Sequence, residues 1–294
     1  MVAGRASEIG HLPEKDAWAF EAIKELLMSE VGFDLEAYKE RCILRRIYLK
    51  VRSGGYSDLG SYYRILKRDR DELEHLVQYL TINVTEFFRN AAAFTYLEKK
   101  ILPALMLQHS VHKSLNVWSA GCSSGEEPYS IAISLLRVRR KHRIRTPFRV
   151  LATDVDKVIL ARGREGNYSR DALKNLEERD LKDFFVEDGN GYRVSEELRQ
   201  HVTFRVSDVL VDRPGRLQSL ILCRNLLIYF SREKQERVIT GFSRAMHPGG
   251  YLMLGKAETL IGMNRLYFQS ISPTERIYRL RDVPLADSRT EPIL

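Results

Sequence analysis

The chain has 294 residues, of which 44% are hydrophobic, and a formal net charge of +8. This length allows one large domain or two smaller ones, and the composition is that of a globular protein. The longest apolar run near the C-terminus, residues 220–230, is interrupted by Arg224 and Asn225. The sequence therefore predicts no membrane span.

Cysteine usage and the N-terminal residues indicate the compartment. Cys42, Cys122 and Cys223 are widely spaced and form neither a zinc-ligand pattern nor a disulfide framework. The N-terminus lacks the apolar core of a signal peptide. We therefore expect a cytoplasmic protein without a metal site. The pI of about 9.3 is compatible with nucleic acid and equally with an acidic protein partner.

The first part of the chain has a helical pattern. We expect a tail over residues 1–14, a helical domain over 15–80 and a linker over 81–90. Apolar residues such as Phe20, Ile23 and Leu27 recur at helical spacing, and Gly54 with Gly55 interrupts the pattern.

From residue 91 to 282, helical stretches alternate with short apolar segments, and a tail is expected over 283–294. The predicted strands are 115–119, 149–153, 202–206, 220–223, 251–254 and 277–280. Strands separated by helices favour a parallel sheet covered on both faces. Residues 184–194 interrupt this alternation and predict a hairpin around the sequence DGNG.

The run WSAGCSSGEEPYSIA at residues 118–132 predicts a buried strand, a glycine loop and a helix start. Such a unit forms the nucleotide-binding corner of an open α/β sheet. Alone it is a weak signal, because glycines between a strand and a helix are often only turn residues. Glu126 and Glu127 disfavour a pyrophosphate and suit a cationic ligand, although acids also stabilise a first helical turn.

Polar residues follow three other predicted strands. Asp154 has the position of a ribose-binding acid, with a solvated loop aspartate as the alternative. Asp208 has the position of an adenine contact, and a helix cap is as good an explanation. Asn225 and Tyr229 are expected at the carboxyl edge of the sheet, where an aromatic side chain is more often core.

Two further segments combine charge with apolar residues. In residues 83–89, Phe87 and Phe88 suit a core, while Asn83, Thr85 and Arg89 are free to face a ligand. A second segment has cations at near-helical spacing: Arg41, Arg45, Arg46, Lys50 and Arg52. A solvated helix face is the simpler interpretation of these cations, and a docking surface for acidic helices or phosphates is the alternative.

Several of these motifs together resemble the CheR family of chemotaxis receptor methyltransferases. The matching segments are TINVTEFFRN at 81–90, residues 118–132, ATDVD at 152–156, CRNLLIYF at 223–230 and GKAE at 255–258. The resemblance implies a helical N-terminal domain and an S-adenosylmethionine-dependent methyltransferase (Rossmann-like) α/β domain. It also implies a small antiparallel β-subdomain, expected at about 166–203.

The resemblance also implies the reaction and the site. A methyl group passes from S-adenosylmethionine to glutamate carboxylates of methyl-accepting chemotaxis receptors, and S-adenosylhomocysteine is released. Glu127 is expected to hold the cofactor's amino group, Asp154 its ribose, and Arg89 and Tyr229 to be catalytic. The remaining implied cofactor residues are Asn83, Thr85, Asp208, Val209, Asn225 and Leu226. Many family members have Asn where this chain has Asp208.

The implied partners are the acidic helices of receptors, which Arg41, Arg45, Arg46 and Lys50 are expected to dock. The short loop near Gly189 predicts no requirement for a tethering peptide. A carboxylate is nucleophilic at neutral pH, which agrees with the lack of an obvious catalytic histidine. The alternatives are a nucleic-acid methyltransferase, a non-catalytic cofactor-binding module and, disfavoured by the acids near Gly121, a nicotinamide oxidoreductase.

Overall fold

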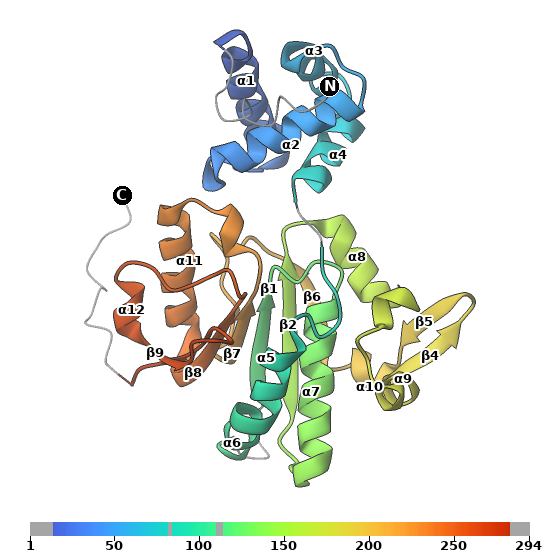
Figure 1. Cartoon of the computed structure of the whole chain (residues 1–294), viewed down its shortest axis with the longest axis vertical. Helices are drawn as coiled ribbons and strands as arrows, with labels where there is room; N and C mark the ends of the chain where they lie inside the picture. Colours follow the sequence, from blue (N-terminus) through green and yellow to red (C-terminus); the bar gives the residue numbers. More distant parts are fainter. Residues whose placement is uncertain (1–13, 82–83, 110–113, 283–294) are drawn as a thin grey trace, which may run out of the picture. The chain divides into compact units, whose positions relative to one another are not determined.

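The computed structural model describes residues 14–81, 84–109 and 114–282, with no side-chain description for Glu14 and Lys15. The described residues form two compact units (Figure 1). One unit is drawn from Met1–Ile82 together with Tyr229–Lys234, and the other from Asn83–Ile228 together with Gln235–Leu294. Each unit is described by itself below.

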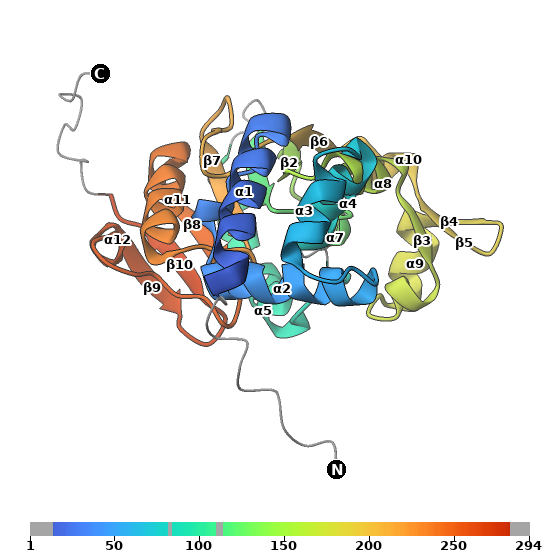
Figure 2. The same ribbon diagram turned by 90° about the horizontal axis from the view of Figure 1, so that it is seen from above.

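The first unit is helical, as its apolar periodicity predicts (Figure 2). Its α-helices are α1 (Glu14–Val31), α2 (Glu40–Ser53), α3 (Leu59–Leu66) and α4 (Arg70–Leu80), with a 3-10 turn η1 (Leu35–Ala37). Asp58 and Asp69 begin α3 and α4 because their side chains accept backbone N–H groups of the first turn. Ile23, Ile47 and Leu76 lie in the core that these helices share.

The second unit contains a seven-stranded sheet in the order β6-β2-β1-β7-β8-β10-β9. The strands are β1 (Leu115–Ala120), β2 (Phe148–Asp154), β6 (Val202–Val206), β7 (Gln218–Cys223), β8 (Met246–Leu254), β9 (Phe268–Ser272) and β10 (Ile277–Leu280). The five strands from β6 to β8 are parallel. The expectation of a wholly parallel sheet is wrong at β10, which runs antiparallel to both neighbours. A short hairpin with β9 reverses the chain there, and β9 was not predicted because its apolar residues are few.

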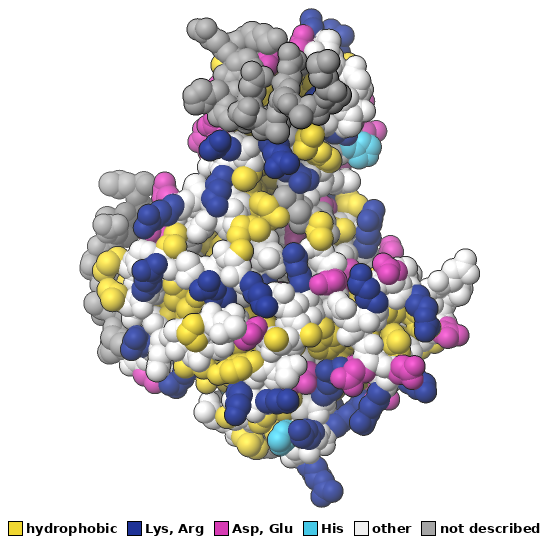
Figure 3. Space-filling model, viewed as in Figure 1, with side chains coloured by type: hydrophobic (Ala, Val, Ile, Leu, Met, Phe, Trp, Pro, Cys, Tyr) yellow, Lys and Arg dark blue, Asp and Glu magenta, His cyan; other side chains and the backbone are white. Residues whose placement is uncertain are grey.

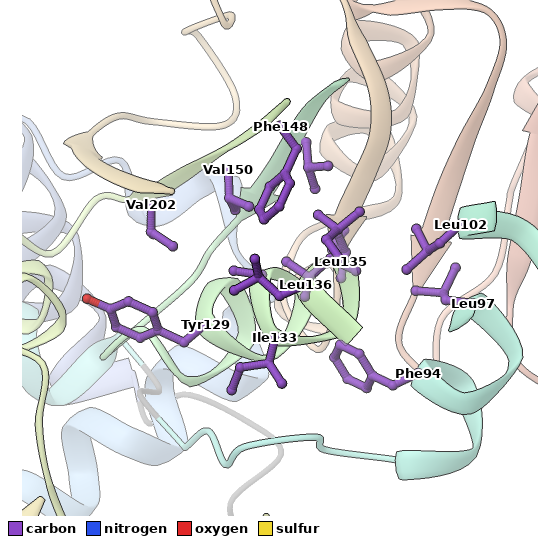
Figure 4. Packing of buried hydrophobic residues seen from close by; sticks show 14 of the residues in the cluster. Phe94, Leu97, Leu102, Tyr129, Ile133, Leu135, Leu136, Phe148, Val150 and Val202 are labelled. Atoms are coloured by element: carbon purple, nitrogen blue, oxygen red, sulfur yellow. The ribbon is translucent and has the colours of Figure 1, made fainter. Parts of the chain in front are cut away.

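Helices cover the sheet (Figure 1). One face carries α5 (Ala91–Tyr96), a π-helical turn η2 (Leu97–Ile101), α6 (Leu102–Leu107) and α7 (Glu126–His142). Figure 4 shows Tyr129, Ile133 and Leu136 of α7 among buried side chains that include Phe148 and Val150 of β2. On the other side, Phe242 of α11 (Arg232–Ala245) packs edge-on against Trp118 of β1, with ring centroids 5.2 Å apart. The remaining helices are α8 (Lys157–Glu165), α9 (Glu178–Phe184), α10 (Glu196–Arg199) and α12 (Asn264–Tyr267).

A second, three-stranded antiparallel sheet contains the predicted hairpin. Its order is β3-β5-β4, with β3 (Asn167–Ser169), β4 (Phe185–Asp188) and β5 (Gly191–Val194). This confirms the small antiparallel sheet expected beside the main one. The 3-10 turn η3 (Asp171–Leu173) lies between β3 and α9.

The segment that precedes α5 is not helical, yet its aromatic residues are core. Phe87 is fully buried and packs edge-on against Tyr168 and Phe185, while Phe88 packs against Phe94. Phe87 and Phe88 therefore belong to the core of the second unit, whereas Val84 of the same segment is exposed.

The face of the molecule in Figure 3 carries charged side chains of both signs. On this face, Lys and Arg side chains are spread among acidic and apolar side chains and do not form one continuous basic patch. Within the described ranges, every helix is too short or too polar to cross a lipid bilayer.

Candidate active site

The candidate site lies in the second unit, where β2, β1 and β7 end side by side. In an open α/β sheet, ligands bind in the crevice beyond the carboxyl ends of the strands. The loop 121–125 leaves β1 there, and the N–H groups of Gly121 and Cys122 both donate to the carbonyl of Thr153. The loop is thereby fixed against the end of β2, next to Asp154.

Two glycines give this loop its shape. Gly121 has φ +75°, and a Cβ atom there would lie 2.8 Å from Cδ2 of Leu226. Gly125 has φ +100°, and its Cβ would lie 2.9 Å from the hydroxyl of Tyr168. Both positions thus combine left-handed backbone with a close approach, which favours glycine for two separate reasons.

Glu127 lies in the interior at the start of α7. Its Oε1 accepts a hydrogen bond from the hydroxyl of Ser119 at 2.7 Å, and its Oε2 lies 3.4 Å from Nη1 of Arg224. The side chain is 11% exposed. Burial raises the pKa of Glu127 above its ordinary value, and the Arg224 guanidinium opposes that rise. The carboxylate thus has one hydroxyl donor and one cationic neighbour in the interior.

Glu126 has a different role from Glu127. Both of its carboxylate oxygens accept from the Ser124 hydroxyl, at 3.0 and 2.7 Å. Its backbone carbonyl accepts the hydroxyl of Ser130. Glu126 therefore belongs to the turn that begins α7, and the two acids predicted as a pair divide into one structural acid and one at the crevice.

Asp154 ends β2 and holds the glycine loop. Its Oδ2 accepts the N–H of Ser123 at 2.9 Å, and its Oδ1 accepts the N–H of Asp156 at 3.0 Å. Burial raises the pKa of Asp154, and these N–H groups oppose the rise. The Asp154 side chain is therefore partly buried, and its carboxylate has two backbone partners.

The predicted adenine contacts lie beside Asp154. The N–H of Ser207 donates to the backbone carbonyl of Asp154 at 2.9 Å, which places residues 207–209 next to that strand end. Asp208 Oδ1 accepts the N–H of Leu210 at 2.8 Å, so it caps a turn, and Val209 is buried.

Asn225 and Leu226 follow β7 at the same end of the sheet. Asn225 has φ +60°, a strained value for a residue with a side chain. Its N–H donates to Oε2 of Glu258 at 2.9 Å. Its Oδ1 is buried and has no hydrogen-bond partner among the described residues. The Leu226 side chain lies directly against Gly121.

The segment 84–89 is attached to the same region by its backbone. The N–H of Phe88 donates to the Ser130 hydroxyl at 2.9 Å, and the Arg89 carbonyl accepts from Nη2 of Arg224. The Arg89 guanidinium donates to the Val84 carbonyl at 2.8 Å and is partly exposed. Thr85 is partly exposed, and Asn83 lies outside the described residues.

Tyr229, the second predicted catalytic residue, falls in the first unit and is partly exposed. Its backbone carbonyl accepts the N–H of Lys39 at 2.8 Å.

The basic residues of α2 are not equivalent. Arg41 and Arg45 are exposed. The Arg46 guanidinium lies over the ring of Tyr79, 4.8 Å from its centroid, and donates to the Tyr79 carbonyl. Lys50 is paired with Glu72 at 3.1 Å. Half of the predicted stripe therefore also stabilises the helical unit.

The ends of β1, β2 and β7 carry acceptor groups of the kind that a ligand with ammonium and hydroxyl donors needs. Glu127 supplies a buried carboxylate, Asn225 Oδ1 is a buried acceptor that lacks a donor among the described residues, and Asp154 adds a second, partly buried carboxylate. A ligand donor near Asn225 would remove the cost of that unpaired oxygen. Such acceptors suit S-adenosylmethionine, and the sheet with its helical covering is that of an S-adenosylmethionine-dependent methyltransferase.

Comparisons with known proteins agree. Residues 83–277 match the model of the CheR methyltransferase SAM binding domain, and residues 18–81 match the CheR methyltransferase all-alpha domain. The chemotaxis protein methyltransferase of Listeria innocua is 37% identical over 249 residues, covering 84% of this chain and 91% of that protein. That of Escherichia coli is 32% identical, covering 84% and 86%. The chain belongs to the CheR family of methyltransferases.

Arg224 and the GKAE motif stand out in the sequence, but the sequence alone gives no role for them. The structure shows that Arg224 joins Glu127 to the Arg89 carbonyl and that Glu258 holds the Asn225 segment. Ser119 and Ser130 were also missed. Each of these residues is a charged or polar residue within or beside an apolar run. This pattern could have indicated their roles, because a buried polar group needs a hydrogen-bond partner.

Proposed function

We propose that this enzyme transfers the methyl group of S-adenosylmethionine to glutamate side chains of chemotaxis receptors in the cytoplasm, forming methyl esters. The observation that carries the proposal is the enclosed Glu127 carboxylate, held by Ser119 and Arg224 at the carboxyl edge of a CheR-family domain. The relatives named chemotaxis protein methyltransferase support the receptor as substrate.

The cofactor, when bound, supplies an electrophilic methyl group on a positively charged sulfur. We assign Glu127 to its ammonium group, Asp154 to its ribose, and Asp208 with Val209 to its adenosine part. Asn225, Leu226, Thr85 and Asn83 complete the cofactor assignment. The buried Asn225 Oδ1 and the close Gly121–Leu226 approach support it.

The protein's contribution to the reaction is position and exclusion of water. A glutamate carboxylate needs no general base, because it is ionised at neutral pH. Opposite charges disappear in the transfer, so a drier site favours it. Holding the carboxylate in line with the methyl group supplies much of the acceleration. We assign this holding to Arg89, whose guanidinium is partly exposed on a segment fixed to α7 and Arg224, and assign Tyr229 a second contact with the reacting groups.

One assay tests the reaction. Labelled S-adenosylmethionine is offered to receptor cytoplasmic fragments and, separately, to nucleic acid, and the product is treated with mild base. The expected result is label on the receptor fragment that base removes, as for a methyl ester. Label on nucleic acid, or a base-stable product, contradicts the proposal. Near-normal methylation by Arg89→Ala would remove Arg89 from its proposed role, and Tyr229→Phe tests Tyr229 in the same assay.

We further propose that the receptor docks through acidic helices on the basic stripe of α2 (Arg41, Arg45, Arg46 and Lys50), without a tethering peptide. The exposure of Arg41 and Arg45 supports the first part. The two-residue connection between β4 and β5 supports the second, because it offers little loop for gripping a peptide. Measurable binding of a receptor-tail peptide to the isolated protein would overturn the second part.

A further inference from the structure

Glu258 is a buried acid that the proposed reaction does not use. It lies in the loop after β8 and is 3% exposed. Its Oε2 accepts the N–H of Gly255 at 2.6 Å and the N–H of Asn225 at 2.9 Å. Its Oε1 accepts the N–H of Ile228 at 3.3 Å. One carboxylate thus takes three backbone donors from two segments of the chain.

These donors lie where two neighbouring strands separate. The register of β7 and β8 ends at the pair Cys223 and Leu254, and each chain then leaves the sheet. The Asn225 and Gly255 N–H groups, which follow that pair, meet on a single oxygen of Glu258. A Cβ on Gly255 would lie 2.8 Å from the Asn225 nitrogen, so the two segments are in close contact.

The same carboxylate supports a strained backbone. Asn225 has φ +60°, and such a conformation persists only where the surroundings hold it. It also presents the buried, unpartnered Oδ1. Burying an acid is costly, and a turn alone does not require one. A carboxylate suits this place because it accepts several N–H groups at once without offering a donor of its own.

We propose that Glu258 is a positioning residue for cofactor binding. It holds residues 225–228 in place, so that Asn225 and Leu226 keep the geometry that the cofactor requires. Its side chain acts through backbone N–H groups. The inference rests on the proposed assignment of Asn225 and Leu226 to the cofactor.

The test compares binding of S-adenosylhomocysteine to the full-length wild type and to Glu258 variants by titration calorimetry. Glu258→Gln retains one oxygen for Gly255 and Asn225 but turns an NH₂ group toward the Ile228 N–H, and we expect affinity about tenfold weaker. Glu258→Ala removes all three acceptors, and we expect a loss of about 100-fold. Glu258→Asp keeps the charge but is one methylene too short, and it should resemble Ala.

A second readout separates positioning from general stability. In steady-state assays, the variants should raise KM for S-adenosylmethionine and leave KM for the receptor fragment unchanged. The matched control is Asp16→Asn, which changes a buried acid of the helical unit that accepts the Tyr48 hydroxyl. Asp16→Asn should lower the melting temperature and leave the affinity for S-adenosylhomocysteine unchanged in the folded protein.

The outcomes are distinct. Unchanged affinity in folded Glu258→Ala overturns the proposal, and if that variant does not fold, unchanged affinity in Glu258→Asp does so. A wild type that fails to bind S-adenosylhomocysteine removes the cofactor assignment itself. A wild type that binds but does not methylate receptors contradicts the proposed substrate and leaves the role of Glu258 to be decided by the calorimetry.

Discussion

The guanidinium of Arg224 lies 3.4 Å from the carboxylate of Glu127, with the two side chains only 2% and 11% exposed. The same guanidinium donates to the Arg89 carbonyl and lies over the ring of Phe94. Arg224 therefore connects the acid assigned to the cofactor with the segment assigned to the substrate. A buried pair of this kind is costly to break, because removing one partner leaves an uncompensated charge.

Replacing Arg224 by Met should destabilise the protein by about 3–5 kcal/mol, since Glu127 then loses its cationic neighbour. Urea unfolding measures the change. Adding Glu127→Gln to Arg224→Met should recover part of the loss, because the unpaired carboxylate is gone. A double variant that is less stable than Arg224→Met alone would contradict the account. Arg45→Met, at an exposed position, should change stability by no more than about 0.5 kcal/mol.

Cofactor affinity should depend on pH through Glu127. Burial raises the pKa of Glu127 above the ordinary 4.5. In a pH window above that value, a fraction of the protein molecules therefore carries a protonated Glu127. Only the ionised form attracts the cofactor's ammonium group, and S-adenosylhomocysteine should therefore bind more tightly as pH rises through the window. Binding there should release protons, which calorimetry in buffers of different ionisation enthalpy detects. In Glu127→Gln, the affinity for S-adenosylhomocysteine should no longer change across this pH window. A change that persists in this variant would point to another titrating group, and Asp154→Asn is then the next variant to test.

The stability of the ligand-free protein should change with pH in the direction opposite to that of cofactor affinity. Burial also raises the pKa values of Glu126, Asp154 and Glu258 in the folded chain. In the window between the ordinary and the raised values, the folded protein keeps protons that the unfolded chain has released. The contribution of these acids to the unfolding free energy of the ligand-free protein should therefore fall as pH rises through this window. Urea titrations at several pH values, compared with those of Glu127→Gln, measure the share of one acid.

Charge reversal at Arg45 should weaken receptor methylation without affecting the fold. Arg45 is exposed on α2, so Arg45→Glu should raise KM for a receptor fragment about fivefold at low salt, equivalent to about 1 kcal/mol. The effect should shrink as salt is added. Arg46→Ala is the matched comparison, because it removes contacts with Tyr79 and should lower stability by about 1–2 kcal/mol. A KM for Arg45→Glu equal to wild type would exclude Arg45 from docking.

Alanine at Gly125 should disturb both the loop and its neighbours. The residue has φ +100°, and a Cβ would lie 2.9 Å from the Tyr168 hydroxyl and 3.2 Å from Cα of Gly163. We expect a loss of about 1–3 kcal/mol in unfolding free energy together with weaker cofactor binding. Gly189→Ala is a useful comparison, because its φ is also positive but nothing lies within 4 Å of its Cβ. Equal losses of unfolding free energy at the two positions would show that the close contacts at Gly125 add nothing to the effect of backbone strain.

The helical first part, the parallel strands from β6 to β8 and the small antiparallel sheet could be predicted, because each has a local periodic signal. Asp154 and Asn225 could be placed at one sheet edge because parallel strands end together. The direction of β10 could not be predicted, since a short apolar segment pairs equally well in either direction. The separate roles of Glu126 and Glu127 also remained hidden, because neighbouring residues on a helix start point in different directions.

Local patterns and motifs in the amino-acid sequence were enough to predict which residues lie at the ends of which strands and to recognise the family. The partners of the charged residues became known only from the folded chain. Arg224 reaches Glu127 across 97 positions of the chain, Glu258 reaches Asn225 across 33, and Arg46 turns inward to Tyr79. The physical reason is that periodicity reports local burial, whereas a buried charge is satisfied by whichever distant group the fold brings to it.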